Sequence, residues 1–367
     1  MRPDKVVYVA AHGGFEGAVV PLGGGAAVFN LLVRQWRRTA PFGLVTVTPA
    51  ILGAQAPKAE DLVGYGERQY ARFCQQFSAA ATARVLEEDP RRVAVLVNDI
   101  SEGPDFERLA KAGYRLTTIY HVDVAAYISK IYLHAWIPPW RLTQLWRGVR
   151  PLRFNSAAPP ILRLIFEQQE ASVFCSRRLI VPSTGMKDTL LRSYPDLPAA
   201  RVHVLPWGCP DLEGQNESAA APAAALRADH GVPREALVLM TLSRISPEKG
   251  QDLLLRALIE WERHGGPGLP VWLFICGAPA YMQGAKFMSK LVSLASKLRR
   301  IHVVFPGYVT GGAKAGFLQM ADIFVFPSRH ESYGLTLMEA MRAGLPCVAL
   351  ESDGASEALG GAGIVVR

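Results

Sequence analysis

The sequence contains no apolar run that approaches the ~20 residues a helix needs to span a bilayer. Its N-terminus, MRPDKVVYVAAHGG, also lacks the long apolar core and the small-residue cleavage site of a signal peptide. We therefore expect a soluble cytoplasmic protein that contacts a membrane at most at its inner face.

Cysteine is scarce, and no two cysteines have the spacing of a metal site. The chain has five: Cys74, Cys175, Cys209, Cys276 and Cys347. An odd number of widely spaced cysteines is typical of reduced, buried thiols rather than of disulfides. The sequence also lacks Asp-x-Asp, a G-x-G-x-x-G after its first apolar run and a G-x4-G-K-[ST]. These absences argue against a dinucleotide fingerprint and a P-loop, and we expect neither a metal ion nor a cofactor.

The net charge of +8 favours a negatively charged partner. The candidate classes are nucleic acid, anionic lipid and a phosphorylated small molecule. We find no zinc-finger spacing, no aromatic RNP-like strand and no basic-region heptads, so we expect no nucleic acid. The alternative to any such partner is a basic surface that only keeps the protein soluble.

The length of 367 residues exceeds that of most single-core domains, so we expect two domains. In both halves, short apolar runs alternate with segments of helical periodicity. In the first half we predict strands at 5–11, 42–49, 91–99, 114–121, 171–183 and 201–208, and helices at 26–38 and near 185–193. Alternation of this kind predicts a doubly wound α/β sheet.

A segment rich in Pro, Ala, Gly and Ser and without periodicity, residues 211–226, is predicted to be a linker. It separates a domain at 1–210 from a second domain at 227–367. In the second we predict strands at 236–243, 271–277, 301–309, 322–328 and 345–351, and helices at 251–264, through 286–300 and from 334 onward. The predicted fold class is α/β with two Rossmann-like domains. Their ligand would bind beyond the carboxyl ends of the strands, in a cleft between the domains.

The loop after the predicted strand 236–243 carries two cations, Arg244 and Lys249, with Pro247 and Gly250 shaping the turn. Arginine offers a planar fork and lysine a mobile point charge, and the pair suits a diphosphate at the mouth of a parallel sheet. The alternative is a surface loop with two ordinary charges.

Two glutamates, Glu331 and Glu339, flank a Ser-Tyr-Gly turn in RHESYGLTLMEAMRAGLPCVA, residues 329–349. The predicted helix begins near Gly334, so its first amides lie where a helix binds an anion. Carboxylates beside a phosphate alone would repel it, but carboxylates accept hydrogen bonds from sugar hydroxyls. A nucleotide sugar carries both groups. Taken singly, each acid has a plainer explanation as a solvated surface charge.

These motifs closely resemble the C-terminal half of family-4-type retaining glycosyltransferases with the GT-B fold, the glycosyl transferases group 1. The resemblance is carried by PEKG after a strand-end arginine, by FPGYV and by ADIFVFPSRHESYGLTLMEAMRAGLPCVA. The Glu-x7-Glu spacing from Glu331 to Glu339 is the signature of that family. The resemblance is specific over about residues 237–350 and weaker but collinear before them.

The resemblance implies that Arg244 and Lys249 neutralise the departing diphosphate. It places Glu331 at the hydroxyls of the donor sugar and Glu339 at the ribose, with the loop at 308–309 meeting the base through its backbone. The implied donor-binding residues of this half are Tyr308, Val309, Ser332, Tyr333, Gly334, Leu335, Thr336 and Glu339. Family members usually continue with helices beyond the point where this chain ends, so the second domain is expected to lack them.

In the first half, the resemblance places Gly23, Gly24 and Gly25 close to the donor pyrophosphate and His121 near the donor sugar. As a bare motif, three glycines more often only form a turn, and a lone strand-end histidine is more often structural. His12, just after the first predicted strand, is a lesser candidate.

Residues 124–154 combine basic and aromatic side chains without any acid. Lys130, Arg141, Arg147, Arg150 and Arg153 alternate with Tyr127, Tyr132, Trp136, Trp140 and Trp146. This composition suits peripheral contact with a membrane or with a polyanionic acceptor. The alternative is that the aromatics fill the core of the first domain and the arginines form its solvated rim.

The function implied by the resemblance is that of a retaining, metal-independent hexosyltransferase. It would move a sugar from a nucleotide diphosphate sugar, its co-substrate, to the hydroxyl of a sugar, lipid-linked or small-molecule acceptor, in glycan, glycolipid or polysaccharide synthesis. The departing phosphate would help to deprotonate the acceptor, so no side chain is the nucleophile. The alternatives are a non-catalytic nucleotide-sugar-binding module, and a sugar phosphorylase or disaccharide-phosphate synthase on the same fold.

Overall fold

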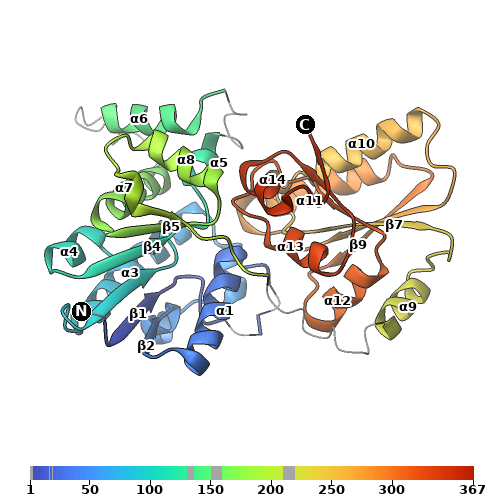
Figure 1. The fold of residues 1–367 in the computed structure, drawn as a ribbon. Coiled ribbons are helices and arrows are strands. Elements are labelled where there is room, and N and C mark those ends of the chain that lie inside the picture. Colours follow the sequence, from blue (N-terminus) through green and yellow to red (C-terminus); the bar gives the residue numbers. More distant parts are fainter. Residues whose placement is uncertain (1–2, 16, 19, 130–135, 150–158, 210–219) are drawn as a thin grey trace. The chain divides into compact units, whose positions relative to one another are not determined.

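The computed structural model describes residues 3–15, 17–18, 20–129, 136–149, 159–209 and 220–367 (Figure 1). The chain divides into two compact units, residues 1–18 with 22–207 and residues 208–367 with 19–21. Each unit is built on its own parallel sheet. No helix in the described ranges is long and apolar enough to cross a membrane.

Among the described residues of the first unit, six strands form a parallel sheet in the order β2-β1-β3-β4-β5-β6. They are β1 Lys5–Val9, β2 Gly43–Val47, β3 Val93–Val97, β4 Arg115–Ile119, β5 Arg178–Val181 and β6 Val202–Val204. The helices are α1 Gly24–Thr39, η1 Pro49–Gln55, α2 Ala59–Gly64, α3 Glu67–Leu86, α4 Phe106–Lys111, α5 Val124–Tyr127, α6 Pro139–Val149, α7 Pro160–Cys175, α8 Thr184–Ser193 and η5 Ala199–Arg201.

Helices cover both faces of this sheet. Since successive side chains of a strand point to opposite faces, each strand packs against helices on both sides. On β1, Val7 and Val9 belong to the core cluster that includes residues of α3 and α4. Tyr8, between them, packs with Phe29 and Val33 of α1 on the other face. Burial on both faces explains why the strands are near-continuous apolar runs in the sequence.

In the part of the second unit that the structure describes, six strands form a parallel sheet in the order β12-β11-β10-β7-β8-β9. They are β7 Leu237–Leu242, β8 Val271–Cys276, β9 Ile301–Gly307, β10 Ile323–Phe326, β11 Cys347–Leu350 and β12 Ile364–Val366. The helices are α9 Ala220–Asp229, η6 Pro247–Lys249, α10 Gln251–Arg263, α11 Tyr281–Ala295, α12 Gly311–Met320, α13 Leu335–Arg342 and α14 Asp353–Leu359.

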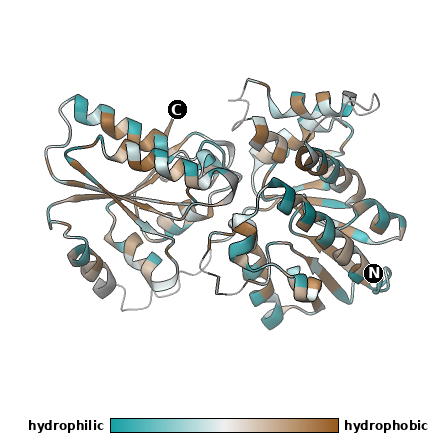
Figure 2. Ribbon diagram, turned by 180° about the vertical axis from the view of Figure 1, so that it is seen from behind, coloured by the Kyte–Doolittle hydropathy of each residue, from teal (hydrophilic) through white to brown (hydrophobic). Residues whose placement is uncertain are grey.

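One core cluster of this sheet includes residues of α12, α13 and α14, and another includes residues of α10 and α11. On β7, Val238 and Met240 belong to the first cluster and Leu239 belongs to the second. Figure 2 shows apolar strands in both sheets and helices of mixed hydropathy around them. The two parallel sheets confirm the predicted α/β class.

Several predicted elements differ from the structure. The strand predicted at 201–208 is only β6, Val202–Val204. Residues 171–175, predicted as the start of a strand, form the end of α7, and the strand is only Arg178–Val181. Residues 220–226 of the predicted linker lie in α9, which packs against α12, while 211–219 lie outside the described residues. Alanine is the best helix former, and an alanine-rich segment shows no periodicity that would reveal its helix. Helix α11 ends at Ala295, five residues before the predicted end at 300.

Gly250 lies where two loops of the second unit meet. It ends η6 with φ 66°, and a Cβ at this position would lie 2.0 Å from the carbonyl oxygen of Pro327. Glycine is required here both by the left-handed backbone and by the close approach of the loop that follows β10.

We expect Gly250→Ala to lower the free energy of unfolding by about 2 kcal/mol or more, because backbone strain and a clash add together. Gly231→Ala is the matched control, since Gly231 also has a positive φ of 64° but no atom within 4 Å of the added Cβ. Gly231→Ala should lower the free energy of unfolding by about 1 kcal/mol, because only backbone strain is added. Urea unfolding of both variants measures the difference, and equal losses would show that the two loops are not in tight contact.

Candidate active site

The loop after β7 holds Arg244 and Lys249 on either side of Glu248. Glu248 is 4% exposed, and its Oε1 accepts hydrogen bonds from Ser246 Oγ at 2.6 Å and from Arg244 Nη2 at 3.4 Å. Burial alone would raise the pKa of Glu248, but Arg244, Lys249 and the Ser246 hydroxyl hold it below its usual value. Glu248 is therefore an anion that fixes the guanidinium of Arg244.

Lys249 is brought to Glu331 by the pairing of β7 with β10. Lys249 Nζ lies 2.6 Å from Glu331 Oε2, and the two side chains are 15% and 13% exposed. Arg329 secures the same two loops, because its backbone amide donates to Glu248 O and its Nη1 donates to Pro247 O and Asp252 Oδ1. The explanation of Glu331 as a solvated surface charge is therefore wrong.

Helix α13 begins after Gly334, whose φ of 96° turns the chain into the helix. Leu335 and Thr336, predicted to bind the donor, are its first residues. Glu339, one turn inside, is 6% exposed, and its Oε1 accepts a hydrogen bond from Lys314 Nζ of α12 at 2.8 Å. Its Oε2 is buried and has no hydrogen-bond partner within the described residues. This oxygen therefore keeps its capacity to accept a hydrogen bond.

Of the two residues in the loop at 308–309, one is exposed and the other is buried. Tyr308 is 38% exposed, and burial followed by the negative charge of Glu339 raises its pKa. Val309 is 8% exposed and belongs to the apolar core, so only its backbone is available to a ligand.

Gly354, in SDGASE at the start of α14, contacts the predicted donor loop directly. Its backbone amide donates to Glu331 O at 3.2 Å, and a Cβ at this position would lie 2.2 Å from the carbonyl carbon of Ser332. Tyr333, the next residue, is 7% exposed. A glycine at position 354 is therefore needed for the loop 331–334 to adopt its observed conformation.

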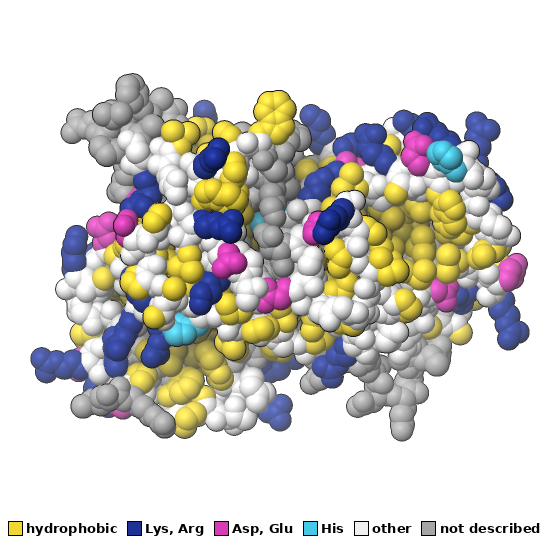
Figure 3. Space-filling model, turned by 45° about the horizontal axis from the view of Figure 1, so that its top comes forward, with side chains coloured by type: hydrophobic (Ala, Val, Ile, Leu, Met, Phe, Trp, Pro, Cys, Tyr) yellow, Lys and Arg dark blue, Asp and Glu magenta, His cyan; other side chains and the backbone are white. Residues whose placement is uncertain are grey.

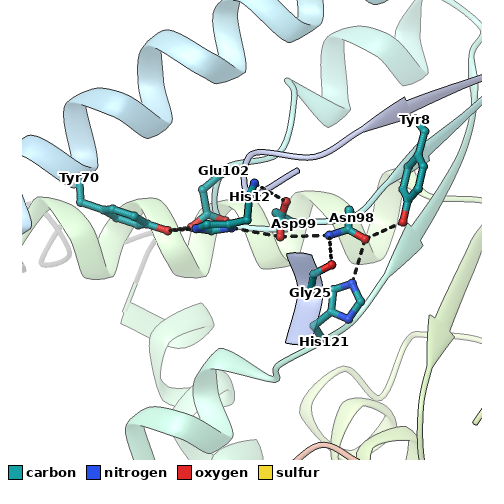
Figure 4. A network of polar contacts seen from close by, with 8 residues as sticks. All are labelled: Tyr8, His12, Gly25, Tyr70, Asn98, Asp99, Glu102 and His121. Carbon is teal, nitrogen blue, oxygen red and sulfur yellow. Dashed lines mark hydrogen bonds and ion pairs between the residues drawn. The ribbon is translucent and has the colours of Figure 1, made fainter. Parts of the chain in front are cut away.

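In the first unit, the predicted residues Gly25 and His121 lie together (Figure 4). Gly23 is the N-cap of α1 with φ 101°, and Gly24 and Gly25 form its first turn. A Cβ on Gly25 would lie 3.2 Å from His121 Cδ2. Asn98, which follows β3, links them, because its Nδ2 donates to Gly25 O at 3.2 Å and its Oδ1 lies 3.0 Å from His121 Nε2.

A second branch of this network runs from Asp99 through His12 and Tyr70 to Glu102 (Figure 4). His12 Nδ1 lies 3.3 Å from Asp99 Oδ1, Tyr70 OH lies 3.1 Å from His12 Nε2, and Tyr70 OH also donates to Glu102 Oε1. Burial alone would raise the pKa of Asp99, but His12 and His121 hold it below its usual value. The pKa of Glu102 is raised, mainly by burial.

Several residues of these clusters are absent from the sequence prediction: Tyr70, Asn98, Asp99, Glu102, Glu248, Lys314 and Gly354. Asn98 and Asp99 directly follow an apolar run, so polar residues at a strand end were a usable signal. Tyr70 on α3 and Lys314 on α12 give no comparable signal, because only the fold brings them to their partners.

The basic and aromatic stretch 124–154 has two different parts in the structure. Trp136 is 89% exposed, whereas Trp146 stacks on Phe166 with ring centroids 4.8 Å apart. Arg147 pairs with Glu170 at 3.2 Å. Lys130, Tyr132, Arg150 and Arg153 lie outside the described residues. Packing thus accounts for Trp146 and Arg147, and contact of this stretch with a membrane stays a prediction.

Figure 3 shows lysine and arginine side chains at many separate places on the face in view, among hydrophobic surface.

The family model of the glycosyl transferases group 1 matches residues 223–364. A D-inositol 3-phosphate glycosyltransferase of Streptomyces griseus is 30% identical over 331 residues, which cover 79% of this chain and 67% of that protein. The chain belongs to the glycosyl transferases group 1. A D-inositol 3-phosphate glycosyltransferase of Saccharomonospora viridis is 34% identical over 198 residues, covering 53% of this chain and 44% of that protein.

Solved structures of glycosyltransferases share the fold of this group 1 transferase. Anabaena HepE in complex with UDP and glucose has a TM-score of 0.62 at 16% identity, covering 99% of this chain and 85% of that chain. Sucrose-phosphate synthase from Thermosynechococcus elongatus has a TM-score of 0.67 at 19% identity, covering 100% and 86%. The predicted GT-B fold is confirmed, and the function is transfer of a sugar from a nucleotide sugar to an acceptor.

His121 should make the stability of the transferase depend on pH. Burial lowers the pKa of His121 to about 4, with Asp99 opposing the shift and His12 adding to it. Between about pH 6.5 and about pH 4 the unfolded chain binds a proton at His121 that the folded chain does not. The free energy of unfolding should therefore fall as the pH is lowered through this window, by up to about 3 kcal/mol.

We expect His121→Gln to remove this part of the pH dependence, since glutamine does not titrate. Urea unfolding of the wild type and the variant at about pH 7 and about pH 4.5 measures it as a difference, in which groups that do not interact with His121 cancel. Identical pH dependence in both proteins would mean that His121 is readily protonated in the folded state.

Proposed function

We propose that this glycosyltransferase retains the configuration at the donor's anomeric carbon, works without a metal ion, and transfers a sugar from a UDP-sugar to a phosphorylated polyol. The proposal is carried by the Lys249–Glu331 ion pair at 2.6 Å, which lies in the second unit at the carboxyl end of the sheet near Arg244. Two fixed cations and a carboxylate match the two halves of a nucleotide sugar.

Arg244 and Lys249 bind the diphosphate in this proposal. As the bond from the anomeric carbon to the diphosphate breaks, negative charge grows on the leaving oxygen, and cations already held in place stabilise it without reorganisation. Two such cations supply the charge that a divalent metal ion would otherwise supply. Glu248 helps to keep Arg244 in position, since its Oε1 accepts a hydrogen bond from the guanidinium.

Glu331 and Glu339 bind hydroxyl groups. With a diphosphate present, Lys249 shares its charge with the phosphate, and Glu331 accepts hydrogen bonds from the donor sugar. Glu339 is held by Lys314 through Oε1, which leaves Oε2 to accept a hydrogen bond from the ribose. The base would contact the loop at Tyr308, whose pKa is raised by burial and by the negative charge of Glu339.

Retention in a single step, without a protein nucleophile, requires that the acceptor attack from the face that the diphosphate leaves. The anomeric carbon loses its bond to the diphosphate, the acceptor oxygen forms the new bond, and the acceptor proton passes to the departing phosphate. The electron pair of the broken bond stays on the diphosphate, so the step balances without a protein nucleophile.

The donor and acceptor classes are suggested by the relatives. The UDP found with HepE suggests a UDP-sugar, and the D-inositol 3-phosphate glycosyltransferases suggest a phosphorylated cyclic polyol as acceptor. A phosphorylated acceptor also agrees with the net charge of +8.

The proposal is tested by incubating UDP-glucose, UDP-N-acetylglucosamine, GDP-mannose and ADP-glucose with the protein, with and without D-inositol 3-phosphate. We expect a UDP-sugar to raise the melting temperature and to be turned over in the presence of EDTA. Lys249→Ala should lower the rate by about 10²–10³, by analogy with loss of an oxyanion donor.

Lys5→Ala is the matched control, because it removes a lysine–carboxylate pair of similar length, 2.7 Å to Glu88, in the other unit. It should leave the rate unchanged. NMR of the product reports the anomeric configuration, and inversion would overturn the retaining mechanism. Binding of a sugar nucleotide without any turnover would instead identify a non-catalytic binding module.

A further inference from the structure

Asn98 lies at the centre of the polar network of the first unit and is 1% exposed (Figure 4). Its Oδ1 lies 2.7 Å from Tyr8 OH and 3.0 Å from His121 Nε2. Its Nδ2 lies 3.2 Å from Gly25 O and 3.3 Å from Asp99 Oδ1. One amide group thus contacts the ends of three strands and the start of α1.

The partners of Asn98 settle which end of its amide is the oxygen. Gly25 O is a carbonyl and Asp99 is a carboxylate whose pKa is held low, so both can only accept hydrogen bonds. The end of the amide that faces them must be the NH₂ group, since the reverse orientation would put three acceptors together. The end that faces His121 is therefore the carbonyl oxygen.

An acceptor at 3.0 Å requires His121 Nε2 to carry a proton. Burial, which lowers the pKa of His121 to about 4, keeps the ring neutral at pH 7, so only one ring nitrogen is protonated. Nδ1 is then an unprotonated acceptor. It makes no hydrogen bond to any residue in the described part of the chain, and the His121 residue is only partly buried.

The ring of His121 also has two close neighbours besides Asn98. Gly25 packs against Cδ2, where even a methyl group would come within 3.2 Å, and the ring of Trp207 lies 5.5 Å away between centroids. The direction of the Nδ1 lone pair is therefore fixed along with the tautomer.

We propose that Asn98 is a positioning residue that holds His121 as the Nε2–H tautomer, so that Nδ1 accepts a hydrogen bond from a hydroxyl of the sugar substrate. The inference rests on the proposed function for its ligand, but the tautomer itself needs no ligand. A purely structural Asn98 would stabilise the fold without controlling which nitrogen of His121 is protonated.

The first test is a two-bond ¹H–¹⁵N correlation spectrum of the protein with ¹⁵N-labelled histidine, at about pH 7. His121→Gln identifies the His121 signals by their loss. We expect Nε2 to have the shift of a protonated nitrogen and Nδ1 that of an unprotonated one. An Nδ1–H ring, or an imidazolium, in the wild type would overturn the proposal, whatever the variants do.

The second test uses Asn98→Asp with the donor and acceptor that the wild type turns over. Aspartate keeps an acceptor for Nε2 and adds a charge that raises the pKa of His121, and the imidazolium has a proton on Nδ1. It also loses the hydrogen bonds donated to Gly25 O and Asp99 Oδ1, so urea unfolding of the variant is measured alongside, and the spectrum of the wild type decides the tautomer if the variant does not fold. We expect kcat/KM to fall about tenfold near neutral pH and to recover as the pH rises above the new pKa of His121. A loss that is the same at every pH would mean a structural role and overturn the proposal.

Tyr8→Phe is the control for the network, because it removes the other hydrogen bond to Asn98 Oδ1 and leaves the His121 contact. It should keep the Nε2–H tautomer and the pH profile of the wild type. If no sugar nucleotide is turned over by the wild type, the proposed function fails, but the spectrum still decides the tautomer. If turnover is normal and Asn98→Asp has the wild-type pH profile, only the role of Asn98 fails.

Discussion

The parallel pairing of the strands is the constraint on which both polar clusters depend. When all strands of a sheet run in one direction, the loops at their carboxyl ends meet at one edge, whatever their distance in sequence. Because β10 pairs with β7, Glu331 reaches Lys249, 82 residues earlier. Because β3 lies between β1 and β4, Asn98 reaches both Tyr8 and His121. The chemistry of each unit is thus set by strand order.

In the second unit the charged side chains form ion pairs, and a charged ligand can take over one partner of such a pair. Burying a lone carboxylate costs several kcal/mol, so Glu331 and Glu339 each need a cation in the free protein. Lys249 and Lys314 supply these cations while remaining partly exposed, at 15% and 24% of their side chains. A diphosphate competes for such a lysine without first having to assemble the site, and preorganisation of this kind lowers the cost of stabilising a leaving group.

The sequence predicted most strands and the loop around Glu331, because apolar runs and turn residues are local signals. It failed at 171–175, where the apolar face of α7 was mistaken for a strand, and at 220–226, where alanine hides helical periodicity. The roles of Arg244, Lys249, Glu331 and His121 stay predictions. Asn98 at a strand end could have been predicted, but Tyr70 and Lys314 could not, since only the packing of distant elements brings them to His12 and Glu339.

The two clusters differ in the kind of group that they are suited to recognise. In the second unit, cations and carboxylates are paired near the surface, which suits a ligand that brings its own charge. In the first unit, Asp99 already has hydrogen bonds from the amide of Asn98 and from His12, and burial keeps His121 neutral. A neutral acceptor nitrogen interacts weakly with a distant charged group. It selects strongly for the direction from which a hydroxyl group approaches, since a hydrogen bond weakens steeply off its axis. Glycosyl transfer needs both properties, because the leaving group is charged while the sugar hydroxyls are neutral and must be held in one orientation.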